Sequence, residues 1–175
     1  MTWQDIAAKK VEERLQKIPP EWRIPQALLP KDPESSVRDW PNTSGFFTAE
    51  ELHITNLTAS EVFSALAQGN LTAEDVTRAV CKRAAAAQQL LNCLTEICFE
   101  DAITRAKELD EYFHKHGKVM GPLHGLPISL KDQFNVRGYD STMGYISRAN
   151  NPASDDSTLV DLLKSAGAIV YCKTY

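Results

Sequence analysis

The sequence predicts an α/β fold in which helices pack on an incomplete mixed sheet and an extended N-terminal arm precedes them. From residue 93 onward, short apolar runs alternate with helical patterns, as is typical of strands joined by helices. Six of the nine prolines lie between Pro19 and Pro41, which favours an extended segment there. We therefore expect a helix and a proline-rich wrapping arm over residues 1–47, and the α/β part over residues 48–175.

The first helix is predicted from its cap and its spacing. Thr2 and Asp5 form a capping-box pattern, and apolar residues then recur at helical spacing until Pro19 ends the pattern. This pattern predicts an amphipathic helix. The arm that follows carries Trp22 and Trp40, and large aromatic side chains gain much from burial. We therefore expect the arm to wrap along the protein rather than to act as a free linker.

Three further helices have readable starts. Each start is a threonine followed three residues later by an acidic residue, a pattern that satisfies free amides of the first turn. The three pairs are Thr48 with Glu51, Thr58 with Glu61, and Thr72 with Asp75. Gly69 suits the end of the second of these helices. The third helix carries an apolar stripe that we expect to cover a sheet, made of Val76, Val80, Ala84, Ala87 and Leu91.

The rest of the chain predicts alternating strands and helices. Residues 93–99 predict a strand, 101–116 a helix with Ala102, Ala106, Leu109 and Phe113 inward, and 126–130 a second strand. A helix is expected to begin at Asp155 and Asp156 and to end at Ala166 and Gly167, before an apolar strand over 168–172. The last three elements form a β-α-β unit, whose strands should be parallel. Because the chain ends just after this strand, we expect unpaired sheet edges.

Composition excludes several classes of function. The formal net charge of -4 and the pI of about 5.6 argue against electrostatic binding of nucleic acid, and no basic stripe is present. No apolar run is long enough to span a bilayer, and the N-terminus lacks a charged leader followed by an apolar core. With 43% hydrophobic residues, the chain is expected to be a globular cytoplasmic protein.

No metal or cofactor site is predicted. The four cysteines, Cys81, Cys93, Cys98 and Cys172, are scattered through apolar segments without CxxC pairs, so we expect buried thiols. His114 and His116 flank a lysine in a polar segment where a helix should end, and a solvated helix end explains them better than metal binding does.

The stretch GPLHGLPISLKDQFNVRGYDST, residues 121–142, contains the best catalytic candidate, Lys131. It lies directly after the apolar strand, and Gly121 and Gly125 permit close backbone approach before that strand. A lysine forced toward an apolar interior loses solvation of its ammonium form, so its neutral amine can act as a general base. The competing interpretation is a surface lysine paired with Asp132. Because such a pair would oppose base function, we assign Asp132 a structural role.

Neighbouring polar residues offer weaker candidates. Ser129 should face the same side of the strand as Lys131, so the two could form a catalytic serine–lysine dyad. A serine whose hydroxyl is satisfied by backbone hydrogen bonds is the simpler interpretation. His124 has no evident partner in the sequence, so a structural role is favoured. The role of Ser141, Thr142 and Met143 stays open between substrate contact and local turn formation.

The runs GPLHGLPISLKD and DDSTLVDLLKSAGAIVYCKT resemble the amidase signature hydrolases, and most closely the fungal acetamidase-type enzymes. The resemblance covers nearly the whole chain and corresponds to the N-terminal third of such enzymes, with residues 48–175 as the beginning of the amidase signature domain. It implies that Lys131 works with two serines, one the nucleophile and one on a cis peptide bond that relays the proton. The resemblance also implies a small carboxamide as substrate, and an arm that helps subunits associate as a homo-oligomer.

In the resembled family those serines lie in a glycine- and serine-rich segment that would follow Tyr175. Because this chain contributes only Lys131, we expect a truncated chain without amidase activity of its own. The pair Lys173 and Thr174 fits the family pattern, whereas Tyr175 departs from it. The alternative function is a non-catalytic interaction module that pairs with a full-length relative. A phosphate or nucleotide site is disfavoured, because neither a GxxxxGK[ST] loop nor a GxGxxG turn is present.

Overall fold

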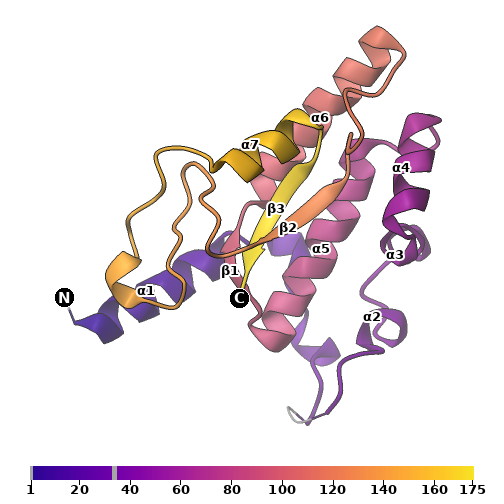
Figure 1. The fold of residues 1–175 in the computed structure, drawn as a ribbon. Coiled ribbons are helices and arrows are strands. Elements are labelled where there is room, and N and C mark those ends of the chain that lie inside the picture. The colour runs from indigo at the N-terminus through magenta and orange to yellow at the C-terminus, as the bar shows by residue number, and fades with distance from the viewer. Residues whose placement is uncertain (1, 33–34) are drawn as a thin grey trace.

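The computed structural model describes residues 2–32 and 35–175, and Figure 1 shows its arrangement. Met1, Pro33 and Glu34 lie outside the described residues. The prediction of an extended, proline-rich arm is therefore not tested at Pro33. The helices are α1 (Trp3–Gln16), α2 (Trp40–Thr43), α3 (Ala49–Asn56), α4 (Ala59–Ala67), α5 (Ala73–Leu91), α6 (Phe99–His116) and α7 (Thr158–Ser165). Three short 3-10 helices are η1 (Pro20–Trp22), η2 (Gln26–Leu28) and η3 (Ile146–Arg148).

The sheet has three strands in the described part of the chain, β1 (Leu94–Ile97), β2 (Pro127–Lys131) and β3 (Ile169–Thr174). Their order is β1-β3-β2, with β3 in the centre, β2 parallel to it and β1 antiparallel to it. The predicted parallel β-α-β unit is therefore confirmed, and the sheet is mixed. Within the described sheet, β1 and β2 each have one unpaired edge, as expected.

Helices cover both faces of the sheet. On one face, α5 and α6 pack side by side, and their apolar residues meet the sheet at Ile97 and Ile169 (Figure 1). On the other face, Val160 of α7 packs on Leu130 and Val170. Ile169 and Val170 thus belong to different clusters, because successive residues of a strand point to opposite faces. The predicted inward residues Ala102, Ala106 and Leu109 of α6 are buried, whereas Phe113 is only partly so.

The predicted helix starts are confirmed. Capping boxes are present at Thr2 of α1, Thr48 of α3 and Thr58 of α4, where each hydroxyl accepts from the backbone amide three residues later. Thr72 accepts from the amide of Asp75 in the same way at α5. The carboxylate of Asp110 on α6 accepts two more amides of the first turn of α5, which ties the two helices together.

Two predictions of detail are wrong. The buried face of α5 is rotated from the predicted apolar stripe. Of the predicted residues, Val80, Ala84 and Ala87 line a surface groove and Leu91 is exposed. The buried face includes Val76, Ala79, Cys81 and Ala85. The helix α7 begins at Thr158 rather than at Asp155 and Asp156. Asp156 instead accepts from the backbone amide of Arg137 and from Lys164, so its carboxylate links the loop after β2 to α7.

The N-terminal arm packs along the rest of the molecule. Trp22 is buried with its ring edge-on to Phe99, at 5.7 Å between ring centroids. The indole of Trp40 donates to the carbonyl of Leu28 at 2.9 Å, and the ring packs against Phe47. Burial of both tryptophans agrees with the prediction that the arm wraps. The division of the chain into residues 1–47 and 48–175 stays a prediction.

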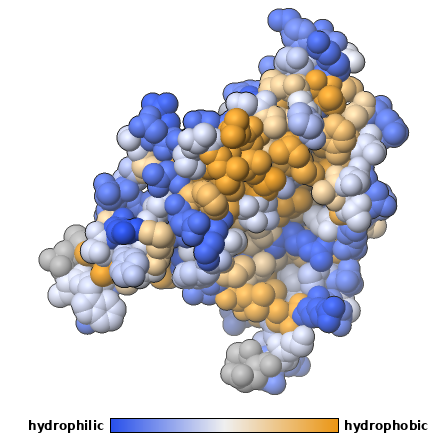
Figure 2. Space-filling view, in the orientation of Figure 1, coloured by the Kyte–Doolittle hydropathy of each residue, from blue (hydrophilic) through white to orange (hydrophobic). Residues whose placement is uncertain are grey.

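Apolar side chains gather on one face over α7 and β2, as Figure 2 shows. Leu159 and Leu162 of α7 are exposed there, next to the partly buried Ile128 and Leu163. On α1, Trp3, Val11 and Leu15 are also exposed, and the helix buries none of its residues. None of the helices in the described residues is long and apolar enough to cross a bilayer.

Candidate functional site

Lys131 is the last residue of β2 and is exposed. The expected burial of this side chain in an apolar recess is therefore wrong. The reason is the alternation of the strand: Leu130 is buried against α7, so Lys131 and Ser129 point to the opposite face, where both are exposed. Because β2 is also an edge strand, neither is covered by a neighbouring strand on its outer side. The role of Lys131 as catalytic lysine stays a prediction.

The turn that leads into β2 lies tightly against the turn between α7 and β3. The amide of Leu123 donates to the carbonyl of Ala166, and the amide of Gly125 donates to the carbonyl of Gly167, each at 2.9 Å. A side chain at Gly121 would place its Cβ only 2.5 Å from the carbonyl oxygen of Ala166. The predicted close backbone approach is confirmed, and it fixes where β2 begins.

His124 lies in this turn and is buried. Its Nδ1 accepts from the amide of Met120 at 3.1 Å, which requires the unprotonated form of that nitrogen. Burial lowers the pKa of His124, and the nearby charge of Asp110 opposes this only in part. The side chain therefore has a backbone partner that was not evident from the sequence, and this contact supports the structural role predicted for it.

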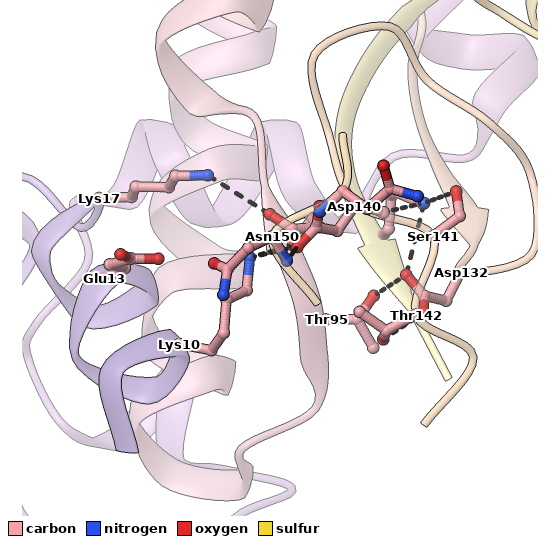
Figure 3. A network of polar contacts seen from close by, with 12 residues as sticks. Lys10, Glu13, Lys17, Thr95, Asp132, Asp140, Ser141, Thr142 and Asn150 are labelled. Atoms are coloured by element: carbon pink, nitrogen blue, oxygen red, sulfur yellow. Dashed lines mark hydrogen bonds and ion pairs between the residues drawn. The ribbon is translucent and has the colours of Figure 1, made fainter. Parts of the chain in front are cut away.

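Asp132 follows Lys131 directly and is buried at the end of the strand (Figure 3). Its carboxylate accepts from the hydroxyls of Thr95 and Thr142 and from the amide of Met143, at 2.6–3.0 Å. Burial alone would raise the pKa of this carboxyl. The hydrogen bonds from Met143, Thr95 and Thr142 together with the charge of Lys173 outweigh burial and hold the pKa of Asp132 below its usual range. The structural role assigned to Asp132 is supported.

Within the described residues, no ion pair joins Asp132 to Lys131. The partner of Asp132 is Lys173 on β3, whose Nζ lies 3.4 Å from the carboxylate. Lys173 has 0% exposed surface, and its ammonium also donates to the carbonyl of Asp140 at 2.6 Å and to the hydroxyl of Ser141 at 2.8 Å. Two N–H groups of Lys173 thus have hydrogen-bond acceptors, and the carboxylate of Asp132 supplies the opposite charge.

Lys173 is the residue that sequence reasoning missed. The pattern IVYCKT was interpreted as a strand that ends at Cys172, with a family-like Lys-Thr pair after it. The strand continues to Thr174, so Lys173 lies inside it. A lysine continuing an apolar strand is itself a signal, because a lysine is almost never fully buried unless it is paired. Its partner Asp132 is 41 positions earlier in the sequence, so the pair was not evident from spacing.

The contact between Ser141 and Lys173 has the composition of a catalytic dyad but not its hydrogen bonding. The hydroxyl of Ser141 donates to the carbonyl of Phe134 at 3.3 Å, and Lys173 donates to that hydroxyl. The single proton of the serine therefore points away from the lysine, and no base accepts it. Ser129 offers no dyad either, since no hydrogen bond joins it to Lys131 in the described structure. It is exposed and lines, together with Tyr171, the groove on the α5 face.

Asp140 connects this cluster to the N-terminal helix. Its carboxylate accepts from the amides of Asn150 and Asn151 at 2.7 and 2.8 Å and from Lys10 at 2.9 Å. Lys10 also reaches Glu96 of β1 at 3.0 Å, and Figure 3 shows Lys10 extending from α1 into the group around Asp140. Burial alone would raise the pKa of Asp140, but Lys10 and the two amides lower it below its usual range. The loop between β2 and α7 is thus tied to α1.

The cysteines are free in the described structure, and no group of His, Cys, Asp and Glu there could hold a metal ion. Cys81, Cys98 and Cys172 are buried, and burial raises the pKa of Cys98 and of Cys172 to about 12. These three agree with the predicted buried thiols, while Cys93 is only partly buried. His114 and His116 are exposed at the end of α6, which agrees with a solvated helix end.

A protein-family model covers more than half of the chain. The family model described as Amidase matches residues 75–175. This segment contains β1, β2 and β3 together with Lys131, Asp132 and Lys173.

Several curated relatives cover 99% of the chain. One is kk1C of Curvularia clavata, which carries the name of an amidase and is 59% identical. Another is named acetamidase, from Emericella nidulans, and is 49% identical. The chain covers 32% and 31% of these two proteins, so it spans about a third of their length.

Solved structures agree on the fold. A structure of fatty acid amide hydrolase matches 98% of this chain with a TM-score of 0.91 at 32% identity, and the match covers 31% of that chain. A peptide amidase from Stenotrophomonas maltophilia matches 68% of this chain and 24% of its own, with a TM-score of 0.62 and 30% identity. The fold described above is therefore similar to a part of these larger proteins, about a third of one and a quarter of the other.

Proposed function

Because the chain belongs to the amidase signature family, we propose that the protein hydrolyses small linear carboxamides, with Lys131 as the base. The observation that carries this proposal is the position of Lys131. It ends a parallel strand, and the crevices that bind ligands in α/β sheets lie outside the carboxyl ends of such strands. Its neighbour Asp132 is fully engaged elsewhere, so Lys131 is not held by the carboxylate next to it.

The proposed chemistry is acyl transfer to serine. A serine oxygen attacks the amide carbonyl, and its proton passes through a second serine to the amine of Lys131, which must be in its neutral form to accept it. The C–N bond then breaks as ammonia leaves with a proton. Water next attacks the acyl-serine ester and releases the carboxylate. The two serines belong to the mechanism that the family implies and are not assigned to residues of this chain. Lys131 is the contribution of this chain to the reaction.

Acetamide is the substrate to try first, because the Emericella nidulans relative is named acetamidase. We expect the 175-residue polypeptide alone to release no ammonia from acetamide, since a base without a nucleophile and an oxyanion site gives little acceleration. Ammonia release that disappears in Lys131→Ala would overturn the expected inactivity but would support Lys131 as a catalytic residue.

A chimera gives the positive test. The chain is joined to the remaining part of the Emericella nidulans acetamidase, to which it is 49% identical over 173 residues. We expect acetamide hydrolysis by the chimera, and a loss of at least about a thousandfold in kcat for Lys131→Ala. The matched control is Lys118→Ala, an exposed lysine outside the cluster, which should leave kcat unchanged. An active chimera that keeps its kcat in Lys131→Ala would refute the role of Lys131.

A second candidate is a non-catalytic interaction module that pairs through its N-terminal arm. The observation that favours it is α1, which buries none of its residues and leaves Trp3, Val11 and Leu15 exposed. The partner proposed is a second copy of the chain, or the same region of a full-length relative. Sedimentation of the wild type and of Trp3→Ser would test it, and a strictly monomeric wild type would count against it.

A cytosolic location also remains a prediction, to be tested by cell fractionation.

A further inference from the structure

The cluster around Lys173 joins β3 to the segment that follows β2, two parts of the chain that are more than 30 residues apart. Asp132 follows β2, Ser141 belongs to the loop after it, and Lys173 lies in β3. Lys173 is the only one of the three that contacts both of the others and also a backbone carbonyl, that of Asp140. It is fully buried, so its contacts are not shared with solvent.

We propose that Lys173 is a positioning residue for Lys131. Its ammonium holds Asp132, the hydroxyl of Ser141 and the carbonyl of Asp140 in one place, and this fixes the strand end from which Lys131 projects. The importance of this for catalysis rests on the proposed function, in which Lys131 is the base. The structural coupling itself does not depend on that function and can be measured separately.

The backbone explains how the effect reaches Lys131. The amide of Asp132 donates to the carbonyl of Thr174 at 2.8 Å, and the amide of Phe134 donates to the carbonyl of Lys131 at 3.0 Å. Lys131 is therefore followed at once by a residue whose amide and carboxylate are both fixed. Because the Lys131 side chain is itself exposed, its direction depends on this backbone rather than on packing around the amine.

The loop opposite the strand end is held in an unfavourable conformation. Met143 has a positive φ of 50°, and its amide donates to the carboxylate of Asp132 at 2.6 Å. A residue with a side chain keeps such a conformation only when its surroundings enforce it. Removal of the ammonium of Lys173 would leave the buried carboxylate without its counter-charge and two oxygen acceptors without a donor. We therefore expect the strand end and this loop to loosen together.

The test is amide hydrogen exchange on the 175-residue chain, comparing the wild type with Lys173→Met. Methionine keeps a long unbranched side chain but removes the charge. We expect the amides of Asp132, Phe134 and Met143 to exchange at least about tenfold faster, with little change at the buried Ala106 of α6.

The control for general destabilisation is Leu109→Ala, which removes a buried side chain from α6. In this variant, exchange at the amides of Asp132, Phe134 and Met143 should not be accelerated more than exchange elsewhere in the protein. Because Lys173→Met alone leaves a buried charge and could unfold the chain, Asp132→Asn combined with Lys173→Met provides a charge-matched variant. In that double variant we expect the fold to persist while the strand-end amides still exchange faster than in the wild type.

A second readout follows Lys131 directly. Lysines are reductively methylated with ¹³C-formaldehyde and a borohydride as hydride donor, and the resonance of Lys131 is assigned by its loss in Lys131→Arg. Lys173→Met, or the double variant if the single one does not fold, should shift this resonance, whereas Leu109→Ala should not. A uniform change in exchange across the core, or an unchanged Lys131 resonance in a folded variant, would overturn the proposal.

The two proposals fail differently. If Lys131→Ala leaves hydrolysis by the acetamidase chimera intact, the proposed function fails, and the exchange result for Lys173 stands on its own. If Lys131 proves essential but Lys173→Met leaves the strand end and the Lys131 resonance unchanged, only the positioning role fails.

Discussion

Gly167 offers the sharpest test of how the strand that carries Lys131 is placed. It has φ of +93°, and a Cβ added there would lie 2.7 Å from Cα and 3.0 Å from N of His124. The contact is with backbone, so it cannot be relieved by a side-chain rotation. The carbonyl of Gly167 also accepts from the amide of Gly125, so any shift disturbs the turn before β2. We expect Gly167→Ala to be strongly destabilising.

The magnitude has two parts that a control separates. A side chain in the left-handed region costs about 1–2 kcal/mol. The clash with His124 adds about 1–3 kcal/mol, as for overpacking elsewhere in proteins. Gly138 has a similar φ of +84° but no atom within 4 Å of an added Cβ, so Gly138→Ala should show the conformational part alone. The expected loss is therefore about 2–5 kcal/mol for Gly167→Ala and about 1–2 kcal/mol for Gly138→Ala.

The assay is denaturant unfolding followed by fluorescence of the buried tryptophans Trp22 and Trp40. Midpoints are compared at equal slopes, so that a change in midpoint reports a change in the free energy of unfolding. A Gly167→Ala variant no less stable than Gly138→Ala would show that the turn before β2 does not lie where the structure places it. The argument that this contact fixes the beginning of β2 would then fail.

Three further outcomes are expected. Because the pKa values of Asp132 and Asp140 lie below the usual 3.8, their stabilisation is complete above about pH 5 and is lost as the pH falls through the folded values, so Asp140→Asn should flatten the acid side of a stability profile. A profile unchanged in Asp140→Asn would contradict this. Cys93 should be the first thiol to react with a disulfide reagent in the native protein, and Cys93→Ser should remove the fast phase while the buried thiols stay slow. Leu109→Ala should cost about 2–5 kcal/mol in denaturant unfolding, and a loss below 1 kcal/mol would contradict its place in the core.

Local signals in the sequence predicted local structure well. The threonine caps at Thr2, Thr48 and Thr58 need only a partner three residues away, so their pattern is complete within one turn. The parallel β-α-β unit followed from alternation of apolar runs and a helix. By contrast, the apolar stripe of α5 was misplaced because alanines fill much of that helix, and alanine fits a buried face or a groove equally well.

The site was harder to predict because its contacts join distant segments. Lys131 was expected to be buried from the apolar run before it, but on a strand the buried residue is its neighbour Leu130. Asp132 was correctly judged structural, although its partner was not identified. Lys173 became visible only when β2 and β3 were paired, since register places residue 173 opposite residue 130 and beside the end of β2.

Lys173 and Lys131 lie near the same end of the sheet but in different environments. Lys173 is buried, donates two hydrogen bonds and forms an ion pair with Asp132. Lys131 is exposed, and no described partner holds its amine. An amine that is to accept a proton in the reaction must not be tied to a carboxylate, because a close negative charge favours its protonated form. By giving Asp132 another counter-ion, the fold keeps a carboxylate at the strand end as a hydrogen-bond acceptor without an ion pair, in the described structure, between it and the adjacent Lys131.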